Sequence, residues 1–114
     1  MTTLYSKSVG ARNIISGHTL HIDDFEEGVK NITEDTILII PNLSVDYEMV
    51  VFEALKKAKI GVIAETGSRT SHLSIIAREL GFTIFIEKDA MKKFKESKLV
   101  TLNPFESEIT ILSF

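Results

Sequence analysis

The middle of the chain alternates regularly between apolar runs and helix-like segments, and this pattern limits the possible folds. The runs are continuous and rich in β-branched residues, which is typical of strands buried on both faces. The segments between them repeat apolar residues at helical spacing. The predicted order is strand 36–40, helix 44–58, strand 60–64, helix 71–80 and strand 82–86. Strands that alternate with helices in this way indicate an α/β fold with a parallel βαβαβ core.

The two flanks of this core are richer in strand than in helix. Their predicted elements are one or two extended segments over 9–22 with a turn at Ser16-Gly17, an acidic loop with a short helical piece over 23–34, a short basic helix over 89–96, and closing strands over 99–102 and 108–112 joined by a turn at 103–104. Gly81 is placed to end the second core helix as its C′ residue. We therefore expect one α/β domain over residues 1–114, with additional strands beside the core.

Composition excludes several classes of protein. The chain has 114 residues, a formal net charge of -3 and a pI near 5.6, and this weakly acidic balance argues against a general nucleic-acid binder, which usually shows a basic face. It has no cysteine, which excludes disulfides and thiolate zinc sites. The first twenty residues show no signal-peptide pattern, and no apolar run is long enough to span a bilayer. We expect a soluble, cytoplasmic protein with no membrane or nucleic-acid partner.

The most informative stretch is residues 65–81, which follows a predicted strand and opens a helix. Ligands of open α/β sheets bind at this place, beyond the carboxyl ends of the strands. Gly67 permits a sharp turn, and Thr70 or Ser71 can cap the helix through a side-chain oxygen. His72 then falls in the first helical turn, where free backbone amides and the helix dipole favour an anion.

This arrangement suits a phosphoryl group carried on the His72 imidazole. The group would be held by the helix amides, the Ser68, Thr70 and Ser71 hydroxyls, and Arg69. Neutral histidine is a nucleophile near physiological pH, and a helix N-terminus disfavours the imidazolium form. One ring nitrogen must attack while the other is oriented by a partner, for which Thr70 is the predicted residue.

Each of these residues also has a purely structural interpretation. A lone histidine in a first helical turn is usually a surface or cap residue, and Arg69 is then simply solvated. Glu65 is either a surface charge at a strand end or a group with an active role, and Arg78 either lies on an exposed helix face or reaches a phosphoryl group on a partner. The apolar positions of this helix are predicted to be core: Leu73, Ile76, Ala77 and Leu80.

His18 and His21 offer a third interpretation, a small-ligand or metal-dependent site. They lie three residues apart, with Asp23 and Asp24 close behind. The alternation over 19–22 predicts strand positions, however, where the two imidazoles would face opposite sides of a sheet.

The stretch Gly67-Ser-Arg-Thr-Ser-His72, followed by Ile75-Ile-Ala-Arg-Glu-Leu-Gly81, resembles the phosphohistidine "swivelling" domain of phosphoenolpyruvate-utilising enzymes. That family includes pyruvate phosphate dikinase and phosphoenolpyruvate (PEP) synthase. The family pattern is a strand, then Gly-Gly-x-Thr-Ser/Cys-His, then Ala-Ala-Ile-Val-Ala-Arg-Glu-Leu-Gly. The strong match covers about residues 64–86.

This resemblance implies a fold, a site and partners. The fold would be the three-layer β/β/α swivelling domain, with His72 as the phosphorylated residue and Gly67 and Ser68 in the phosphate loop. Thr70 would match a threonine that regulatory kinases modify in some relatives. In the family, the domain swings between an ATP-grasp-type nucleotide-binding unit, which charges the histidine, and a TIM barrel, which binds PEP or pyruvate with magnesium.

The chain departs from the family pattern at several positions. Ser68 replaces the second glycine, Leu73-Ser74 replaces the Ala-Ala pair, Thr83 replaces a proline, Glu87 replaces a glycine, and Asn103-Pro104-Phe105 replaces an Asp-Gly turn. Ser68 adds a side chain where backbone approaches phosphate. These changes leave two hypotheses open. One is an active carrier, and the other is a catalytically degenerate regulatory or protein-interaction module with the same fold.

A sequence of 114 residues has no room for an ATP loop or a barrel. We therefore expect a stand-alone carrier that serves partner subunits of a PEP synthase or pyruvate phosphate dikinase-like phosphotransferase, or of another phosphotransferase. ATP and Mg²⁺ are expected on those subunits, with no cofactor or metal bound by this domain alone.

Overall fold

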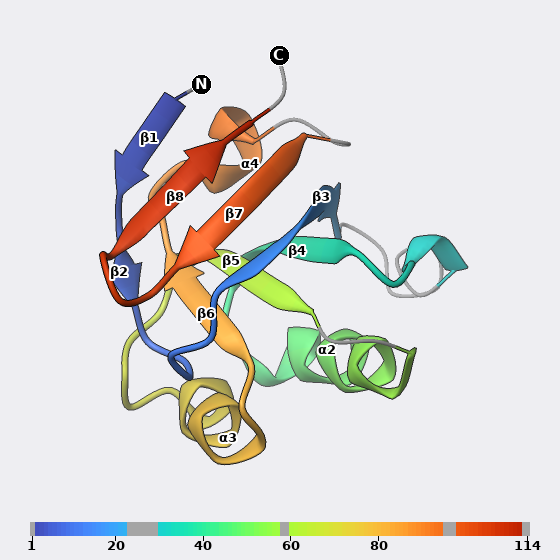
Figure 1. Cartoon of the computed structure of the whole chain (residues 1–114). Helices are drawn as coiled ribbons and strands as arrows, with labels where there is room; N and C mark the ends of the chain where they lie inside the picture. The colour runs from blue at the N-terminus through green and yellow to red at the C-terminus, as the bar shows by residue number, and fades with distance from the viewer. Residues whose placement is uncertain (1, 23–29, 58–59, 95–97, 113–114) are drawn as a thin grey trace.

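The computed structural model describes residues 2–22, 30–57, 60–94 and 98–112. Its elements follow in the order β1 (Thr2–Tyr5), β2 (Lys7–Ser8), β3 (Ile15–His21), β4 (Thr36–Asn42), α2 (Val45–Lys57), β5 (Gly61–Thr66), α3 (His72–Leu80), β6 (Thr83–Ile86), α4 (Ala90–Lys93), β7 (Leu99–Asn103) and β8 (Glu108–Ile111) (Figure 1). Most of the loop predicted over 23–34, namely 23–29, lies outside the described residues. In the described ranges, no helix has the length and apolar character needed to cross a membrane.

The strands form one eight-stranded sheet in the order β1-β8-β7-β3-β4-β5-β6-β2. Strands β3, β4, β5 and β6 pair in parallel, and the remaining pairs are antiparallel. In the parallel part, Leu38 lies opposite Val62, and Val62 lies opposite Ile84. The connections β4–α2–β5 and β5–α3–β6 confirm the predicted parallel βαβαβ core within a mixed α/β fold.

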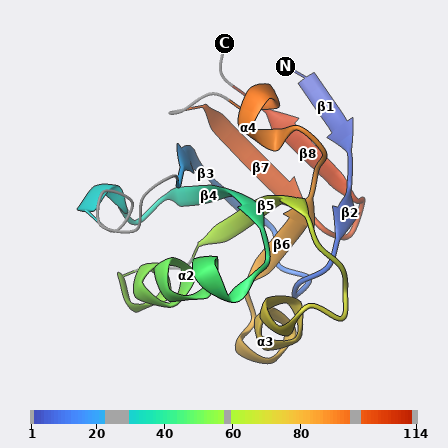
Figure 2. The same ribbon diagram turned by 180° about the vertical axis from the view of Figure 1, so that it is seen from behind.

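Both faces of β4, β5 and β6 are buried along most of their length, which explains why their sequences are continuous apolar runs. One face packs against α2 and α3, through a cluster that includes Val51 and Leu73 on the helices. The opposite face packs against α4 and the antiparallel strands, through Phe94, Leu102 and Ile109. Figure 2 shows α2 and α3 lying on one side of these strands and α4 on the other.

The strands β1 and β2 were not expected from the sequence. They are consecutive in the chain, yet they lie at opposite margins of the sheet, β1 against β8 and β2 against β6. Ser6, which separates them, donates its backbone N–H to the Ser107 carbonyl and its hydroxyl to the Ile86 carbonyl. The sheet must therefore curl until its two margins approach one another, because a single residue connects them.

The turn expected at Ser16-Gly17 is wrong, because both residues lie inside β3 and pair with β7. Glycine is required at position 17 for a different reason. A Cβ there would approach the Asp35 carbonyl oxygen to 2.3 Å. The close approach of β3 to the start of β4 therefore depends on a missing side chain rather than on a turn.

At the end of α3, the prediction for Gly81 is confirmed and the prediction for Leu80 is wrong. Gly81 adopts a left-handed conformation with φ 88° and donates its N–H to the Ala77 carbonyl, as expected of a C′ glycine. Leu80 is not core, since its side chain is 65% exposed. It lies in the last turn and lines an open cleft instead of packing on the sheet.

Candidate functional site

The loop between β5 and α3 lies beyond the carboxyl ends of the parallel strands. Gly67 begins it with φ 152°, and a Cβ there would lie 2.6 Å from Leu43 Cδ1. A side chain at this position would therefore meet Leu43, which precedes α2. The glycine lets the loop pass close to the segment that connects β4 to α2, as expected from the need for a sharp turn.

His72 is the first residue of α3, and Ser71 is the N-cap. The imidazole side chain is 69% exposed, so the ring is open to solvent beside the first turn of a nine-residue helix. The amides of a first turn have no carbonyl partner within the helix, which makes this end of α3 suited to an anion.

A second ionisable group contacts the ring from α2. Both carboxylate oxygens of Glu48 lie 3.1 Å from His72 Nδ1. The Glu48 side chain is only 10% exposed, whereas the imidazole is largely open. Since Nδ1 is engaged by the carboxylate, Nε2 is the ring nitrogen left for a reacting group.

Sequence reasoning missed Glu48. The periodicity of α2 could have indicated it, because Glu48 is in register with the buried positions of that helix. In that helix Met49 is 61% exposed, while Val50, Val51 and Ala54 are buried. Glu48 is buried with them, three residues before Val51. An acidic residue in register with the core-facing positions is the pattern that indicates a buried carboxylate with a partner.

The loop hydroxyls bond mainly to one another. Ser68 Oγ lies 3.0 Å from Thr70 Oγ1 and 3.4 Å from Ser71 Oγ, and the Ser68 N–H donates to Ser71 Oγ at 3.1 Å. Ser71 is the N-cap, but its side-chain oxygen does not accept the predicted hydrogen bond from a backbone N–H of the first helical turn. Its oxygen accepts from the preceding loop instead. The Thr70 hydroxyl pairs with Ser68, while the ring nitrogen predicted to contact it pairs with Glu48.

Arg69 and Arg78, the two arginines near the His72 loop, differ in role. Arg69 is exposed in the loop, two residues before the N-cap. Arg78 is half-buried and donates to the carbonyls of Val9 at 2.8 Å and Arg69 at 2.9 Å. Arg78 thus ties α3 to the N-terminal segment and to the loop, which neither of its two sequence interpretations anticipated.

Glu65 is half-buried at the end of β5. Its Oε2 accepts a 3.2 Å hydrogen bond from the backbone N–H of Met91 in α4. The carboxylate therefore connects β5 to the short helix that covers the opposite face of the sheet from α3, rather than lying free at a strand end.

The histidines of β3 do not form a joint site. His18 Nδ1 lies 2.7 Å from Asp35 Oδ2, and His21 Nε2 contacts the Phe94 carbonyl. The hydrogen bonds from His18 and Thr33 hold the pKa of the Asp35 carboxyl below its ordinary value. Within the described ranges, no three His, Asp or Glu side chains gather in a metal-binding group, and Asp23 and Asp24 lie outside those ranges.

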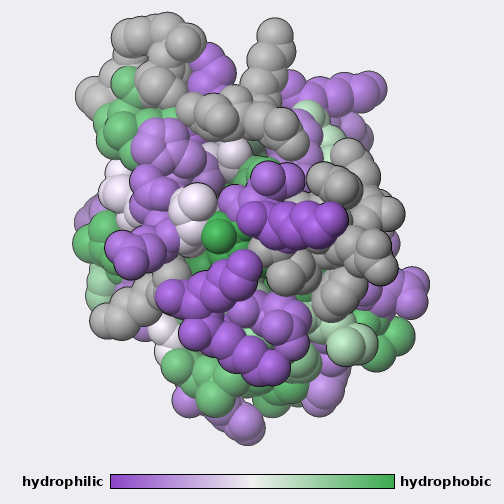
Figure 3. Space-filling model, turned by 90° about the vertical axis from the view of Figure 1, so that its right-hand side faces the viewer, coloured by the Kyte–Doolittle hydropathy of each residue, from purple (hydrophilic) through white to green (hydrophobic). Residues whose placement is uncertain are grey.

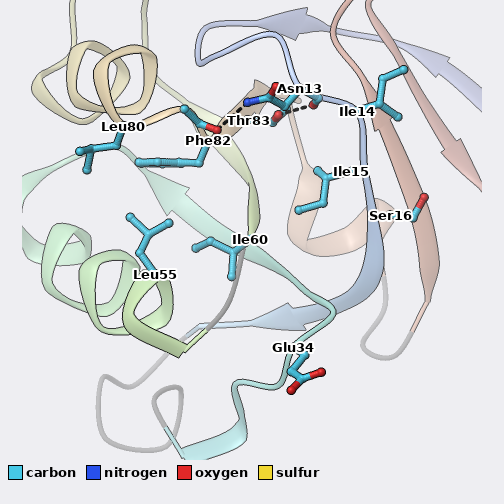
Figure 4. A pocket seen from close by; sticks show the side chains of 11 residues that line it. Asn13, Ile14, Ile15, Ser16, Glu34, Leu55, Ile60, Leu80, Phe82 and Thr83 are labelled. Carbon is cyan, nitrogen blue, oxygen red and sulfur yellow. Dashed lines mark hydrogen bonds between the residues drawn. The ribbon is translucent and has the colours of Figure 1, made fainter.

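A cleft of about 710 Å³ lies at the other end of the parallel strands, away from His72. Leu55 of α2, Ile60 before β5, Leu80 at the end of α3 and Phe82 before β6 line it (Figure 4). The Asn13 amide donates to the Gly81 carbonyl at its edge. Figure 3 looks onto the side from which β4 and β5 start and shows hydrophobic patches separated by polar side chains. None of the predicted site residues within the described ranges lines this cleft.

Comparison with known proteins places the chain in a family. Residues 32–106 match the model of the family described as "PEP-utilising enzyme, mobile domain". The chain belongs to this family. It is 32% identical over 99 residues to the phosphoenolpyruvate synthase of Pyrococcus furiosus and to the probable phosphoenolpyruvate synthase of Pyrococcus horikoshii. The match takes in 85% of this chain but only 11% of each relative's length.

Two solved structures share the fold at low sequence identity. The solution NMR structure of a UPF0107 protein has a TM-score of 0.71 and 15% identity, with 98% of this chain and all of that chain covered. The holo-form crystal structure of Thermococcus kodakaraensis aconitase X has a TM-score of 0.65 and 16% identity, with 99% and 100% covered. At these identities, the likeness establishes the fold alone.

Proposed function

We propose that the chain is a phosphoryl carrier in which His72 accepts a phosphoryl group and passes it on. The observation that carries the proposal is the position of the imidazole. It is 69% exposed at the first residue of α3, with Nδ1 held by Glu48 and Nε2 without a hydrogen-bond partner among the residues that the structure describes. A nucleophile that must meet two different partners has to be exposed, and it has to be held in one orientation.

The surroundings of the ring fit a bound phosphoryl group. The amides of the first helical turn and the Ser68, Thr70 and Ser71 hydroxyls are donors close to the ring in sequence and in the loop. Arg69 is exposed beside them and supplies a positive charge. Together, these groups would balance part of the charge of a phosphoryl group on Nε2.

Carrier function requires partners, and we propose those of the family. An ATP-grasp-type unit with ATP and Mg²⁺ would load His72, and a TIM-barrel unit with PEP or pyruvate would exchange the group. The domain itself would hold neither cofactor. Its β/β/α layering, with α2 and α3 on one face and β7 and β8 on the other, would be the swivelling domain that moves between them.

The test is phosphoryl labelling with a matched control. The protein is incubated with labelled PEP and a PEP-dependent phosphotransferase, or with γ-labelled ATP and a nucleotide-binding partner. We expect a label that is acid-labile and base-stable, absent in His72→Ala and retained in His18→Ala, which removes another exposed imidazole. A label that survives in His72→Ala refutes the assignment.

One observation favours a second function, that of a binding module without phosphoryl chemistry. Ser68 stands at a family glycine, and its side chain occupies the loop between the Thr70 and Ser71 hydroxyls. If that side chain blocks the phosphoryl group, wild-type protein stays unlabelled and Ser68→Gly becomes labelled. An unlabelled Ser68→Gly would support the binding module.

A further inference from the structure

The closest charged neighbour of the His72 ring is a carboxylate from another helix. Glu48 is 10% exposed and, among the described residues, the hydrogen bonds to its oxygens come from His72 Nδ1. A carboxylate removed from water in this way needs a donor, because burial of an unpaired charge is costly. The Glu48–His72 contact is therefore expected to persist in solution despite the exposure of the ring.

An ionised carboxylate only accepts hydrogen bonds, so a ring nitrogen that contacts it must carry a proton. The contact therefore selects the neutral tautomer with hydrogen on Nδ1 and a lone pair on Nε2. Free imidazole side chains in water favour the opposite tautomer, with hydrogen on Nε2. Glu48 thus imposes the form in which the exposed nitrogen is the nucleophile.

Building on the proposed function, we infer that Glu48 is a positioning residue that keeps the proton on His72 Nδ1 throughout the phosphoryl cycle. It directs the phosphoryl group to Nε2, and it lets the ring depart from that group as neutral imidazole. The Glu48 carboxylate itself touches neither the phosphoryl donor nor the acceptor.

With hydrogen held on Nδ1, the phosphoryl group can be loaded and transferred without any proton moving. During loading, the Nε2 lone pair forms a bond to phosphorus, and the bond from phosphorus to the donor's leaving group breaks. The loaded ring then carries phosphoryl on Nε2, hydrogen on Nδ1 and a positive charge, which faces the Glu48 carboxylate. During transfer, the acceptor forms a bond to phosphorus, and the electrons of the phosphorus–nitrogen bond return to Nε2. The ring is neutral again, and no proton has moved.

Without the carboxylate, the loaded ring is free to lose its Nδ1 proton to solvent. The departing group is then an imidazolate anion, which is a much poorer leaving group than imidazole. The charged residues on the neighbouring elements do not replace Glu48 in this role. Asp46 lies on the first turn of α2, Arg69 is exposed in the loop, and Arg78 is engaged by the Val9 and Arg69 carbonyls.

The first experiment needs no phosphoryl transfer. Long-range ¹H–¹⁵N NMR of the His72 ring, at a pH where its own titration curve shows it neutral, reports which nitrogen carries hydrogen. We expect hydrogen on Nδ1 in the wild type and on Nε2 in Glu48→Leu. Glu48→Gln keeps the shape and an acceptor oxygen but removes the charge, so it is the variant for the second experiment if the leucine variant folds poorly. Glu53→Gln, on the exposed side of α2 beside Lys56, should match the wild type.

The second experiment loads the ring with phosphoramidate, a small phosphoryl donor that releases ammonia. In the wild type, we expect ³¹P and ¹⁵N spectra of Nε2-phosphohistidine whose hydrolysis stays fast to higher pH than in Glu48→Leu or Glu48→Gln. The profile of either variant should move down by about one pH unit or more, which is about tenfold in rate on the alkaline side. Glu48→Leu should also give some Nδ1-phosphohistidine.

The outcomes separate this inference from the proposed function. A wild-type ring with hydrogen on Nε2, or identical tautomers and hydrolysis profiles in wild type and Glu48→Leu, overturns the role of Glu48 even if His72 is phosphorylated. Conversely, if no enzymatic partner labels His72 but the tautomer changes as expected, the carrier function fails while the action of Glu48 on the ring stands.

Discussion

The Ser74 hydroxyl donates a 2.7 Å hydrogen bond to the carbonyl oxygen of Ser68, joining α3 to the loop that precedes it. Both residues depart from the family pattern, which has glycine at position 68 and alanine at position 74. Ser74 is fully buried, so this contact is shielded from water. The serine at position 74 thus anchors the backbone of the loop at residue 68, a bond that the family's alanine cannot make.

Replacing Ser74 with alanine should therefore loosen the loop. The Ser68 carbonyl would keep its longer 3.2 Å bond from the Ser71 N–H but lose the shorter one. We expect a loss of about 1 kcal/mol in the free energy of unfolding, measured by urea denaturation. Ser16→Ala, which removes an exposed hydroxyl bonded to Thr101, is the control and should change stability by less than about 0.5 kcal/mol. Equal losses in both variants would contradict a special role for the buried bond.

Two glycines with positive φ should respond differently to alanine. At Gly67, a Cβ would meet Leu43 side-chain atoms at 2.6 and 2.8 Å, whereas at Gly81 it would lie 3.7 Å from Asn13 Nδ2. Gly81→Ala should carry only the left-handed backbone cost of about 1–2 kcal/mol. Gly67→Ala should lose more stability than this and should also slow phosphoryl labelling. Thermal unfolding of the two variants, compared directly, checks the order, and a milder effect at Gly67 would contradict the close packing against Leu43.

Arg78 should contribute to the stability of the fold, which a solvated side chain on an exposed helix face would not do. Arg78→Met retains much of the apolar stem but removes the two charged donors to the Val9 and Arg69 carbonyls. We expect a loss of about 1–3 kcal/mol by chemical denaturation, together with faster hydrogen exchange in the 68–71 loop. Glu79→Gln, on the exposed side of the same helix, should leave both measurements within error. An effect confined to partner binding would instead support contact with a phosphoryl group.

The pair His18–Asp35 predicts a specific pH dependence. The hydrogen bond from His18, and then that from Thr33, lowers the pKa of Asp35 in the folded state from its ordinary value of 3.8. Because the folded pKa is the lower one, the stabilisation is present above the unfolded pKa and is lost as pH falls through the folded pKa. An NMR titration of the Asp35 side-chain carbonyl carbon should give a midpoint below 3.8 in the wild type, moving upward in His18→Ala. An unchanged midpoint would show that the pair does not form in solution.

The parallel core was predictable because a strand that is buried on both faces has an apolar residue at nearly every position. Runs such as 37–40 are apolar at every position, and each of these four residues is fully buried. The short strands β1 and β2 left no such trace. Their residues are exposed or half-buried, and their pairing with β8 and β6 is long-range, so local pattern cannot reveal it.

For the site, the position of His72 was predictable and its partner was not. A strand, a glycine, a run of hydroxyl residues and a helix start are all local features, and they place the imidazole correctly at the first turn of α3. Glu48 is 24 residues away and reaches the ring only through the packing of α2 on the sheet. Local spacing instead suggested Thr70, whose hydroxyl is already engaged by Ser68.

The placement of β1 and β2 at the two margins of the sheet has a consequence for self-association. Unpaired strand edges are templates on which a second molecule can add a strand. Here one segment of seven residues, Thr2–Ser8, shields β8 on one side and β6 on the other. Detachment of that segment would uncover both templates at once, and molecules in this state would be able to link end to end into growing chains.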